Sequence, residues 1–470
     1  MLTRRALLRA GSVLTASTAA GLPAIANADT PKGAPWSSLG KHLQGRLLLP
    51  DDGAYSATKE LIDPQFDRAT PAAVVEAATI EDVQAATVFA KENGLSVAAR
   101  AGGHSYVGAS ATPDSLVVDL RKLSDISLGA DQVTIGAGAS VYSVLSELAK
   151  SGRALPVGRC PTVGLAGLTL GGGIGVDSRR YGLTCDQLTA ATIVLPQGHS
   201  VDASDARSGE LFWALRGAGA AIGIATSLTY RTQPAIPKDI VRLTFPDQEL
   251  LQVLTAWSQW VAAADRAIWS GVEISIEPNE ARCEVTIVGP QGEGARAAND
   301  FIAAAAKPMR DDRKSLPHLG AVQAYGGGTT TPRTRKVAGS DVIARFSPAV
   351  VKTIVDVVAA RSRTGAAARV LIEPLDGAVS DTRSGDSAFP WRDHAGVVQW
   401  MVDEPDAPEG ARQWINDAHR ALGDASAGGY ANYSEHGVGA DRYYGGNLIR
   451  LNVTRRFADP DGRLCSGIAF

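Results

Sequence analysis

Two residues whose side chains can take part in chemistry, a histidine and a cysteine, lie among clustered glycines. His104 lies in Arg100-Ala101-Gly102-Gly103-His104-Ser105-Tyr106-Val107-Gly108, directly after a strand-like run. Cys160 lies in Gly158-Arg159-Cys160-Pro161-Thr162-Val163-Gly164-Leu165-Ala166-Gly167-Leu168-Thr169-Leu170-Gly171-Gly172-Gly173-Ile174-Gly175. Glycine permits positive φ and close approach of a ligand, and successive amides in such a turn bind anions. The first loop therefore predicts a phosphate or pyrophosphate site, and the second predicts a large flat ligand against the backbone.

These loops match neither of the common nucleotide fingerprints. The first is not Gly-x-Gly-x-x-Gly and has no Walker lysine, so the Rossmann and P-loop patterns do not fit. The alternative is a tight turn with a structural histidine and a buried core cysteine. A third glycine-containing segment follows, at Leu211-Phe212-Trp213-Ala214-Leu215-Arg216-Gly217-Ala218-Gly219, and continues with Gly223-Ile224-Ala225-Thr226.

Aromatic residues gather near the C-terminus. They lie in Tyr430-Ala431-Asn432-Tyr433, in Tyr443-Tyr444-Gly445-Gly446-Asn447-Leu448-Ile449-Arg450-Leu451 and in Phe457-Ala458-Asp459-Pro460. A phenol with a pKa near 10 is a poor base at neutral pH, so a site that uses one must lower that pKa. The alternative is that these tyrosines pack in the core.

The elements around these residues follow an α+β pattern. Thr79 and Asp82 form a capping box before one helix, and Ser140 begins a second that stops before Gly152. Short strands are expected at 96–100, 116–120 and 132–135. A composition shift at 232–237 leads to expected helices at 248–264 and 348–364 and a strand at 284–288.

The N-terminus is expected to be an export signal. Residues 1–28 contain Thr3-Arg4-Arg5-Ala6-Leu7-Leu8-Arg9, a mild apolar stretch and the small-residue site Ala26-Asn27-Ala28. This is typical of a twin-arginine signal, which carries folded proteins to the periplasm or the exterior. The alternative is a frayed basic helix.

Composition excludes several classes. The 470 residues carry 46 Lys+Arg against 49 Asp+Glu, so a net charge of −3 gives no general attraction to nucleic acid. Hydrophobic residues make up 45%, which argues against disorder, and four cysteines are too few for a disulfide scaffold. Neither the cysteines nor the histidines have metal-ligand spacing. No membrane segment is expected after signal removal, and no oligomeric state is predicted.

Taken together in this order, the three glycine segments and the C-terminal motif resemble the berberine-bridge-enzyme-like branch of the vanillyl-alcohol-oxidase family. The resemblance implies an α+β fold: a PCMH-type FAD-binding domain of two subdomains and a substrate domain whose antiparallel sheet is covered by helices. The expected division is 1–28 signal, 29–237 FAD-binding domain, 238–425 substrate-binding domain and 426–470 a segment that returns to the FAD domain.

The resemblance also implies a bicovalent FAD, bonded through His104 to the flavin 8α-methyl and through Cys160 to flavin C6. Two departures bear on the cofactor contacts: Leu168 follows Gly167, and the third motif reads Gly217-Ala218-Gly219-Ala220-Ala221-Ile222-Gly223. Besides His104 and Cys160, the expected cofactor-binding residues are Arg100, Gly102, Gly103, Ser105, Tyr106, Gly108, Val163, Gly164, Gly167, Gly171, Gly172, Gly175, Gly223, Ile224, Tyr444 and Asn447.

For catalysis, the resemblance implies that Tyr433 is the general base and that Glu373 orients it or binds substrate. Tyr430 and Gln399 are expected to bind substrate, although Gln399 also fits a surface strand position. In plant relatives a valine at the position of Val163 accompanies oxygen reactivity.

The implied activity is oxidation of an alcohol, on a sugar, oligosaccharide or glycosylated metabolite, with molecular oxygen as acceptor. The alternatives are a dehydrogenase, an oxidative cyclase of a secondary metabolite, and a non-catalytic flavin- or ligand-binding protein.

Overall fold

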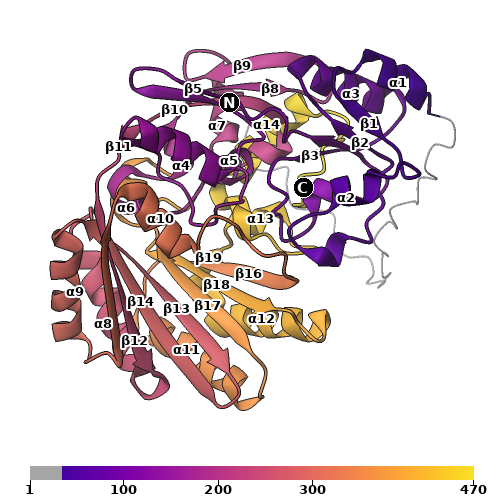
Figure 1. The fold of residues 1–470 in the computed structure, drawn as a ribbon. Helices are drawn as coiled ribbons and strands as arrows, with labels where there is room; N and C mark the ends of the chain where they lie inside the picture. Colours follow the sequence, from indigo (N-terminus) through magenta and orange to yellow (C-terminus); the bar gives the residue numbers. More distant parts are fainter. Residues whose placement is uncertain (1–33) are drawn as a thin grey trace, which may run out of the picture. The chain divides into compact units, whose positions relative to one another are not determined.

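The computed structural model describes residues 34–470 (Figure 1), so the predicted signal at 1–28 lies outside the described residues. Residues Pro35–Phe470 form one compact unit. Among the described residues, no helix is long and apolar enough to cross a membrane.

The first part of the chain builds two sheets and a set of short helices. In the four-stranded sheet, β2 and β3 run parallel to β4 and β1 is antiparallel, whereas the five-stranded sheet is antiparallel throughout. The four-stranded sheet has the order β1 (Arg46–Leu48), β2 (Ala73–Glu76), β4 (Leu116–Asp119), β3 (Val97–Arg100). The five-stranded sheet has the order β5 (Ile126–Leu128), β6 (Gln132–Gly136), β10 (Ile224–Arg231), β8 (Leu188–Val194), β9 (Ser200–Ser204). A small ribbon pairs β7 (Arg153–Ala154) with β11 (Gln233–Pro234).

Two helices of this part begin at the side-chain caps that the sequence predicts. Thr79 and Asp82 form the expected capping box at α3, and the Ser140 hydroxyl accepts the Ser143 amide at the start of α4. The helices are α1 (Trp36–His42), α2 (Tyr55–Lys59), α3 (Ile80–Glu92), α4 (Val141–Lys150), α5 (Leu165–Leu170), α6 (Ser178–Tyr181) and α7 (Gly209–Leu215).

The second part is one antiparallel sheet of eight strands. Its order is β15 (Arg310–Leu316), β12 (Lys238–Pro246), β14 (Glu280–Pro290), β13 (Trp269–Glu277), β17 (Ala368–Pro374), β18 (Gly396–Asp403), β16 (Lys336–Ile343), β19 (Ser426–Gly428). The accompanying helices are α8 (Leu250–Ala263), α9 (Glu293–Ala304), α10 (His318–Gly326), α11 (Pro348–Arg363) and α12 (Pro408–Leu422).

The two faces of this sheet have different partners. Alternating residues such as Val272, Ile274, Val370 and Ile372 join a core that α8, α9, α11 and α12 cover. Because side chains alternate along a strand, Glu273 and Glu373 belong to the opposite face. That face carries α10 and the residues that are predicted to act on substrate.

The chain ends beside its beginning. After α13 (Ala440–Tyr444) and α14 (Leu448–Ala458), the Val97 amide of β3 donates to Arg463 O at 2.8 Å, and Cys465 N donates to Val97 O at 2.9 Å. The C-terminal residues therefore run along the first sheet. The α+β class and the helix-covered antiparallel sheet are confirmed, whereas the predicted boundaries after residues 237 and 425 stay predictions.

Candidate active site

The two glycine loops touch each other through their backbones. A Cβ added to Gly102 would lie 2.2 Å from Gly164 N, and a Cβ added to Gly164 would lie 2.4 Å from Gly102 N. Real Cβ atoms do not approach other atoms so closely, so both positions need glycine. The loop after β3 is thereby held against the loop that leads into α5.

The first loop presents a run of free backbone donors. Within residues 34–470, the amides at 102–106 have no hydrogen-bond acceptor. The turn that follows is fixed, because Ser105 Oγ accepts the Val107 and Ala109 amides at 3.3 Å each and Gly108 has a φ of +67°. Successive free amides bind phosphate groups well, so this donor set fits the pyrophosphate of FAD.

His104 reaches from this loop to the second one. Its Nε2 lies 2.9 Å from Thr162 Oγ1. Burial lowers the pKa of His104 to about 4, a shift that the Thr162 contact opposes and the charge of Lys336 reinforces. The imidazole is therefore neutral at pH 7, the form that can act as a nucleophile. Cys160, two residues before Thr162, is half-buried and has a free thiol.

Arg100 holds the first loop to the preceding chain. The buried Arg100 guanidinium donates to the carbonyls of Thr58 and Glu60 and lies 3.9 Å from Asp119. Burial lowers its pKa to about 10. The predicted contact of Arg100 with the cofactor stays a prediction. In the structure, its hydrogen bonds tie the start of the loop to residues 58–60.

The glycines after Cys160 differ from the expectation that a ligand fills the space beside them. A Cβ on Gly171 would lie 2.1 Å from Asn432 Oδ1, and one on Gly172 would lie 2.9 Å from the Phe389 ring. A Cβ on Gly175 would lie 1.8 Å from Val157 O. The protein itself occupies this space. Gly167 is the exception among the predicted residues of this run, because it is exposed and nothing lies within 4 Å of its Cβ position.

The third glycine segment, at 211–226, packs against the second, at 158–175. Gly217 has a φ of +130° and its Cβ position lies 2.3 Å from Phe389 N, while that of Gly219 lies 2.4 Å from the Leu170 side chain. Gly223 and Ile224 are buried where β10 begins. Phe389 thus packs against two of the glycine segments at once.

Tyr433 and Glu373 form the most distinctive pair of the site. The Tyr433 hydroxyl donates to Glu373 Oε2 at 2.7 Å. Tyr433 lies in a 3-10 turn at Ala431–Tyr433, and Glu373 lies near the end of β17 with 5% of its surface exposed. Burial raises the pKa of Tyr433 well above its ordinary value, and the Glu373 charge raises it further. The protein surroundings of Tyr433 therefore raise the phenol pKa, and a lowered pKa beside bound flavin stays a prediction.

Three more predicted residues surround this pair. The Tyr433 ring lies 6.1 Å from the Tyr106 ring and 4.9 Å from the Tyr430 ring, both edge-on. Gln399 Nε2 donates to the Tyr106 hydroxyl at 3.2 Å, so Gln399 is buried at the site and is not a surface position. The Tyr430 hydroxyl accepts the Gly173 amide at 2.9 Å, which ties the C-terminal segment to the second glycine loop.

Arg159 brings positive charge to the same place. Its Nη1 lies 3.4 Å from Glu273 Oε2, and its guanidinium carbon lies 5.1 Å from the centre of the Tyr325 ring. Burial raises the pKa of Glu373, and the Arg159 charge, followed by the Tyr433 hydrogen bond, counteracts that rise. Arg159 therefore favours the ionised form of the carboxyl group that accepts the Tyr433 proton.

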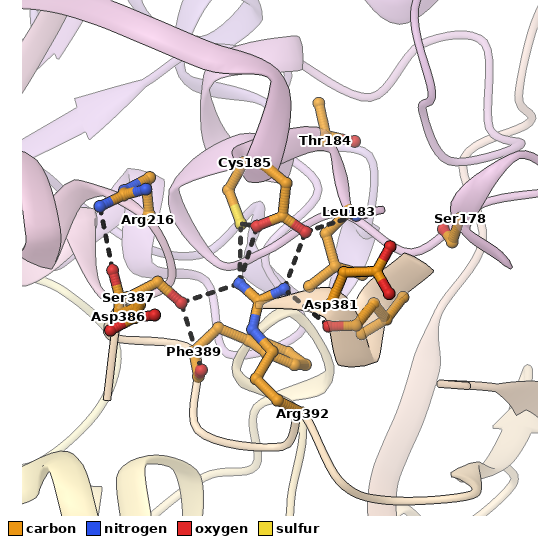
Figure 2. A network of polar contacts seen from close by, with 12 residues as sticks. Ser178, Leu183, Thr184, Cys185, Arg216, Asp381, Asp386, Ser387, Phe389 and Arg392 are labelled. Atoms are coloured by element: carbon orange, nitrogen blue, oxygen red, sulfur yellow. Dashed lines mark hydrogen bonds and ion pairs between the residues drawn. The ribbon is translucent and has the colours of Figure 1, made fainter. Parts of the chain in front are cut away.

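Figure 2 shows how the Phe389–Arg392 stretch is anchored. The fully buried Arg392 makes two contacts with the Asp186 carboxylate, at 2.7 and 2.8 Å. It also donates to Ser387 Oγ at 2.8 Å (Figure 2). Cys185 Sγ lies 3.8 Å from the same guanidinium. This buried ion pair joins the loop before β18 to the turn that follows the second glycine loop.

Two predicted cofactor residues have other partners. Tyr444 stacks on Phe470 with ring centres 5.7 Å apart. Asn447 Nδ2 donates to Ser384 O at 2.7 Å and Ser387 O at 3.0 Å, so this amide supports the loop before Arg392. The structure does not bring these side chains to the Tyr433 pair, and their contact with FAD stays a prediction.

Comparisons with known proteins agree with this architecture. A family model described as FAD binding domain matches residues 71–204, which include both glycine loops. An uncharacterised FAD-linked oxidoreductase of Bacillus subtilis is 29% identical over 433 residues, covering 89% of this chain and 95% of the relative. A chitooligosaccharide oxidase of Gibberella zeae is 27% identical over 425 residues, covering 83% and 85%. Among solved structures, Physcomitrella patens BBE-like 1 matches with a TM-score of 0.84 at 22% identity, covering 91% and 97%.

These findings define an FAD-linked oxidoreductase with a PCMH-type FAD-binding domain and an antiparallel-sheet domain. The match over residues 71–204 and the structural likeness to Physcomitrella patens BBE-like 1 agree with the predicted resemblance to the berberine-bridge-enzyme-like group. The predicted fold is confirmed, and FAD as cofactor follows from the matching domain.

Two residues of the site were not predicted from the sequence. Arg159 stands out in the sequence only as part of a glycine-rich loop, although an arginine beside the predicted attachment cysteine is a visible signal. Asn432 donates to Leu168 O at 2.9 Å and to the Tyr430 hydroxyl at 2.8 Å, filling the space beside Gly171. Its role depends on a contact across 264 residues that no local pattern encodes.

Proposed function

We propose that this protein is an oxidase that converts an alcohol group of a sugar, oligosaccharide or glycosylated metabolite to a carbonyl. The Tyr433–Glu373 hydrogen bond of 2.7 Å carries the proposal, because it joins a phenol to a buried carboxylate beside both glycine loops. Bound FAD supplies the acceptor for the hydride that leaves the substrate carbon. Overall, the alcohol loses two electrons and two protons, and O2 takes them up as H2O2.

The chain's own residues handle the hydroxyl proton. Tyr433 alone is a weak base, because its phenol is protonated and its pKa is raised. Its proton, however, already points at Glu373. When the substrate hydroxyl gives its proton to the Tyr433 oxygen, the phenol proton can pass to Glu373 in the same step. Glu373 is then the final acceptor and Tyr433 the group that touches substrate.

Tyr106, Gln399 and Tyr430 shape the space around Tyr433. The Tyr430 hydroxyl binds backbone amides and Asn432, so its contribution to substrate binding is its ring. Gln399 holds the Tyr106 hydroxyl, which orients that ring edge toward Tyr433. The similarity to a chitooligosaccharide oxidase supports a carbohydrate as the substrate class.

We also propose that His104 and Cys160 both bond to the flavin. The neutral imidazole of His104 and the half-buried free thiol of Cys160 are suitable nucleophiles on adjoining loops. Two bonds would keep the cofactor in place outside the cell. Export through the twin-arginine-type signal at 1–28, to the periplasm or exterior, belongs to the same proposal, and N-terminal sequencing of secreted protein would test it.

The decisive experiment is a screen for H2O2 release with a panel of mono- and oligosaccharides and aromatic alcohols. An oxidase gives peroxide in proportion to product. A dehydrogenase, the alternative that Val163 disfavours, reduces its flavin anaerobically but releases little peroxide in air. An oxidative cyclase of a secondary metabolite gives no peroxide with the sugars of the panel. A flavin spectrum that no alcohol or sugar bleaches would overturn the proposed activity in favour of a ligand-binding protein.

A further inference from the structure

Behind the segment that carries Tyr433 lies a charged cluster that the catalytic proposal does not use. His419 of α12 stands between two carboxylates: Nδ1 is 2.7 Å from Asp341 Oδ2, and Nε2 is 2.9 Å from Glu435 Oε2. Asp341 belongs to β16 and is fully buried, while Glu435 follows Tyr433 by two residues. The imidazole thus links the sheet to the catalytic segment.

Both contacts require the protonated ring. A neutral imidazole would turn one nitrogen lone pair toward a carboxylate oxygen, whereas the imidazolium donates from both nitrogens. Burial opposes the charge, but the hydrogen bonds to Asp341 and Glu435 outweigh it and raise the pKa of His419 to about 9. The clamp is therefore complete at neutral pH and is lost as the pH rises through about 9.

The other charged group of the cluster is Arg442 of α13. It donates to Asp341 Oδ1 at 2.9 Å and lies 3.7 Å from Glu435 Oε1. It also lies 3.1 Å from His419 Nδ1, a repulsive contact between cations that the two carboxylates offset. Two positive and two negative groups balance when His419 is protonated, and deprotonation leaves one excess buried negative charge.

The cluster holds Glu435 beside a cavity. The segment that follows Tyr433 lines a cavity of about 70 Å³, whose other walls include Tyr106, Lys336 and Ala338. The segment therefore has free volume beside it, next to Tyr106. Its backbone is held by two further hydrogen bonds on this side: Glu435 N donates to the Tyr443 hydroxyl at 2.8 Å, and Tyr430 N donates to Ser340 Oγ at 3.0 Å.

We propose that His419 is a positioning residue for the oxidation, an ionic clamp that holds residues 430–435 so that Tyr433 keeps its bond to Glu373. This inference rests on the proposed role of Tyr433. His419 itself touches neither substrate nor the reacting atoms. Its loss allows the segment to shift into the neighbouring cavity, which lengthens the Tyr433–Glu373 contact and slows proton removal without changing the flavin loops.

The test compares His419→Gln with a matched control elsewhere in the fold, His318→Gln. His318 is a buried histidine bonded to buried Asp177 at 3.1 Å, so its loss has a comparable structural cost away from Tyr433. With the sugar that gives the highest peroxide signal, we expect H419Q to lower the anaerobic flavin-reduction rate at least tenfold at pH 7. We expect KM within threefold of wild type and an unchanged flavin spectrum, while H318Q retains the wild-type rate.

The pH dependence separates positioning from general destabilisation. The wild-type reduction rate should fall above pH 9, whereas H419Q should lack that descending limb. His419→Arg, which keeps a cation, should recover part of the rate and also lack the limb. Equal rates in H419Q and wild type, or an unaltered limb near pH 9 in H419Q, would overturn the clamp. If no sugar or alcohol reduces the wild-type flavin, the proposed function fails. The clamp is then tested by limited proteolysis at different pH values. The rate of cleavage within 434–439 should increase above pH 9 in the wild type and should not change with pH in H419Q.

Discussion

The Tyr433 hydroxyl donates its hydrogen bond to Glu373 and to no other described acceptor, so the phenol proton has a defined destination. Tyr433 belongs to the C-terminal segment and Glu373 to β17, in the middle of the eight-stranded sheet. The pair forms only when the last part of the chain returns across the sheet. In the proposed mechanism, catalysis therefore depends on correct docking of the C-terminal segment.

Tyr433→Phe removes the oxygen that receives the substrate proton in the proposed mechanism, but it keeps the ring contacts with Tyr106 and Tyr430. We expect flavin reduction by substrate to slow by about 10²- to 10⁴-fold, the usual contribution of a general base. The bound flavin should remain. Stopped-flow absorbance under anaerobic conditions measures the rate, and an unchanged rate would defeat the assignment of Tyr433.

Arg159→Met should shift the pH dependence of flavin reduction. The Arg159 charge lowers the pKa of Glu373, so its removal raises that pKa and leaves the carboxyl group protonated to a higher pH. The ascending limb of the reduction rate should therefore move to higher pH. Arg369→Met is the matched control, because Arg369 lies 3.5 Å from the same Glu273 yet is not among the charges that shift Glu373. If the ascending part of the pH profile of flavin reduction is the same in R159M as in the wild type, Arg159 does not control the pKa of Glu373.

The two proposed covalent bonds to FAD can be tested one residue at a time. Acid precipitation of the wild type should leave flavin in the pellet. His104→Ala and Cys160→Ala should each retain it through the remaining bond, and the double variant should release it to the supernatant. Absorbance of both fractions at the flavin maximum gives the result. Flavin retained in the pellet of the double variant would mean that another residue forms the bond.

Local structure was predictable where the signal is local. The capping box at Thr79 and the cap at Ser140 define their helices, because the hydrogen bonds lie within three residues. The pairing of Tyr433 with Glu373 came from resemblance, since their chain separation of 60 residues leaves no local trace. The sequence predicted a ligand beside Gly171 and Gly172. The structure places Asn432 and Phe389 there instead, and both come from distant segments that no local pattern reveals. The raised phenol pKa likewise depends on burial that a sequence does not display.

Arg392→Met should be among the most destabilising single changes. It leaves the Asp186 carboxylate without its cation in a buried setting, which typically costs about 3–5 kcal/mol. The double variant Arg392→Met with Asp186→Asn should recover part of this loss, because it removes the uncompensated charge. Denaturant unfolding monitored by tryptophan fluorescence compares the three proteins. Equal stability of the single and double variants would show that the ion pair contributes by packing alone.

Gly102→Ala should disrupt the junction of the two glycine loops. The new methyl group would lie 2.2 Å from Gly164 N, a backbone atom that cannot move away by a side-chain rotation. Overpacking of this kind costs about 1–3 kcal/mol, and the displaced loop would also lose the alignment of the amides at 102–106. We therefore expect a lower melting temperature together with a reduced flavin-to-protein ratio. Gly209→Ala is the control, since nothing lies within 4 Å of its Cβ position at the start of α7. If G102A loaded flavin as fully as G209A, the free amides of this loop would not be the pyrophosphate site.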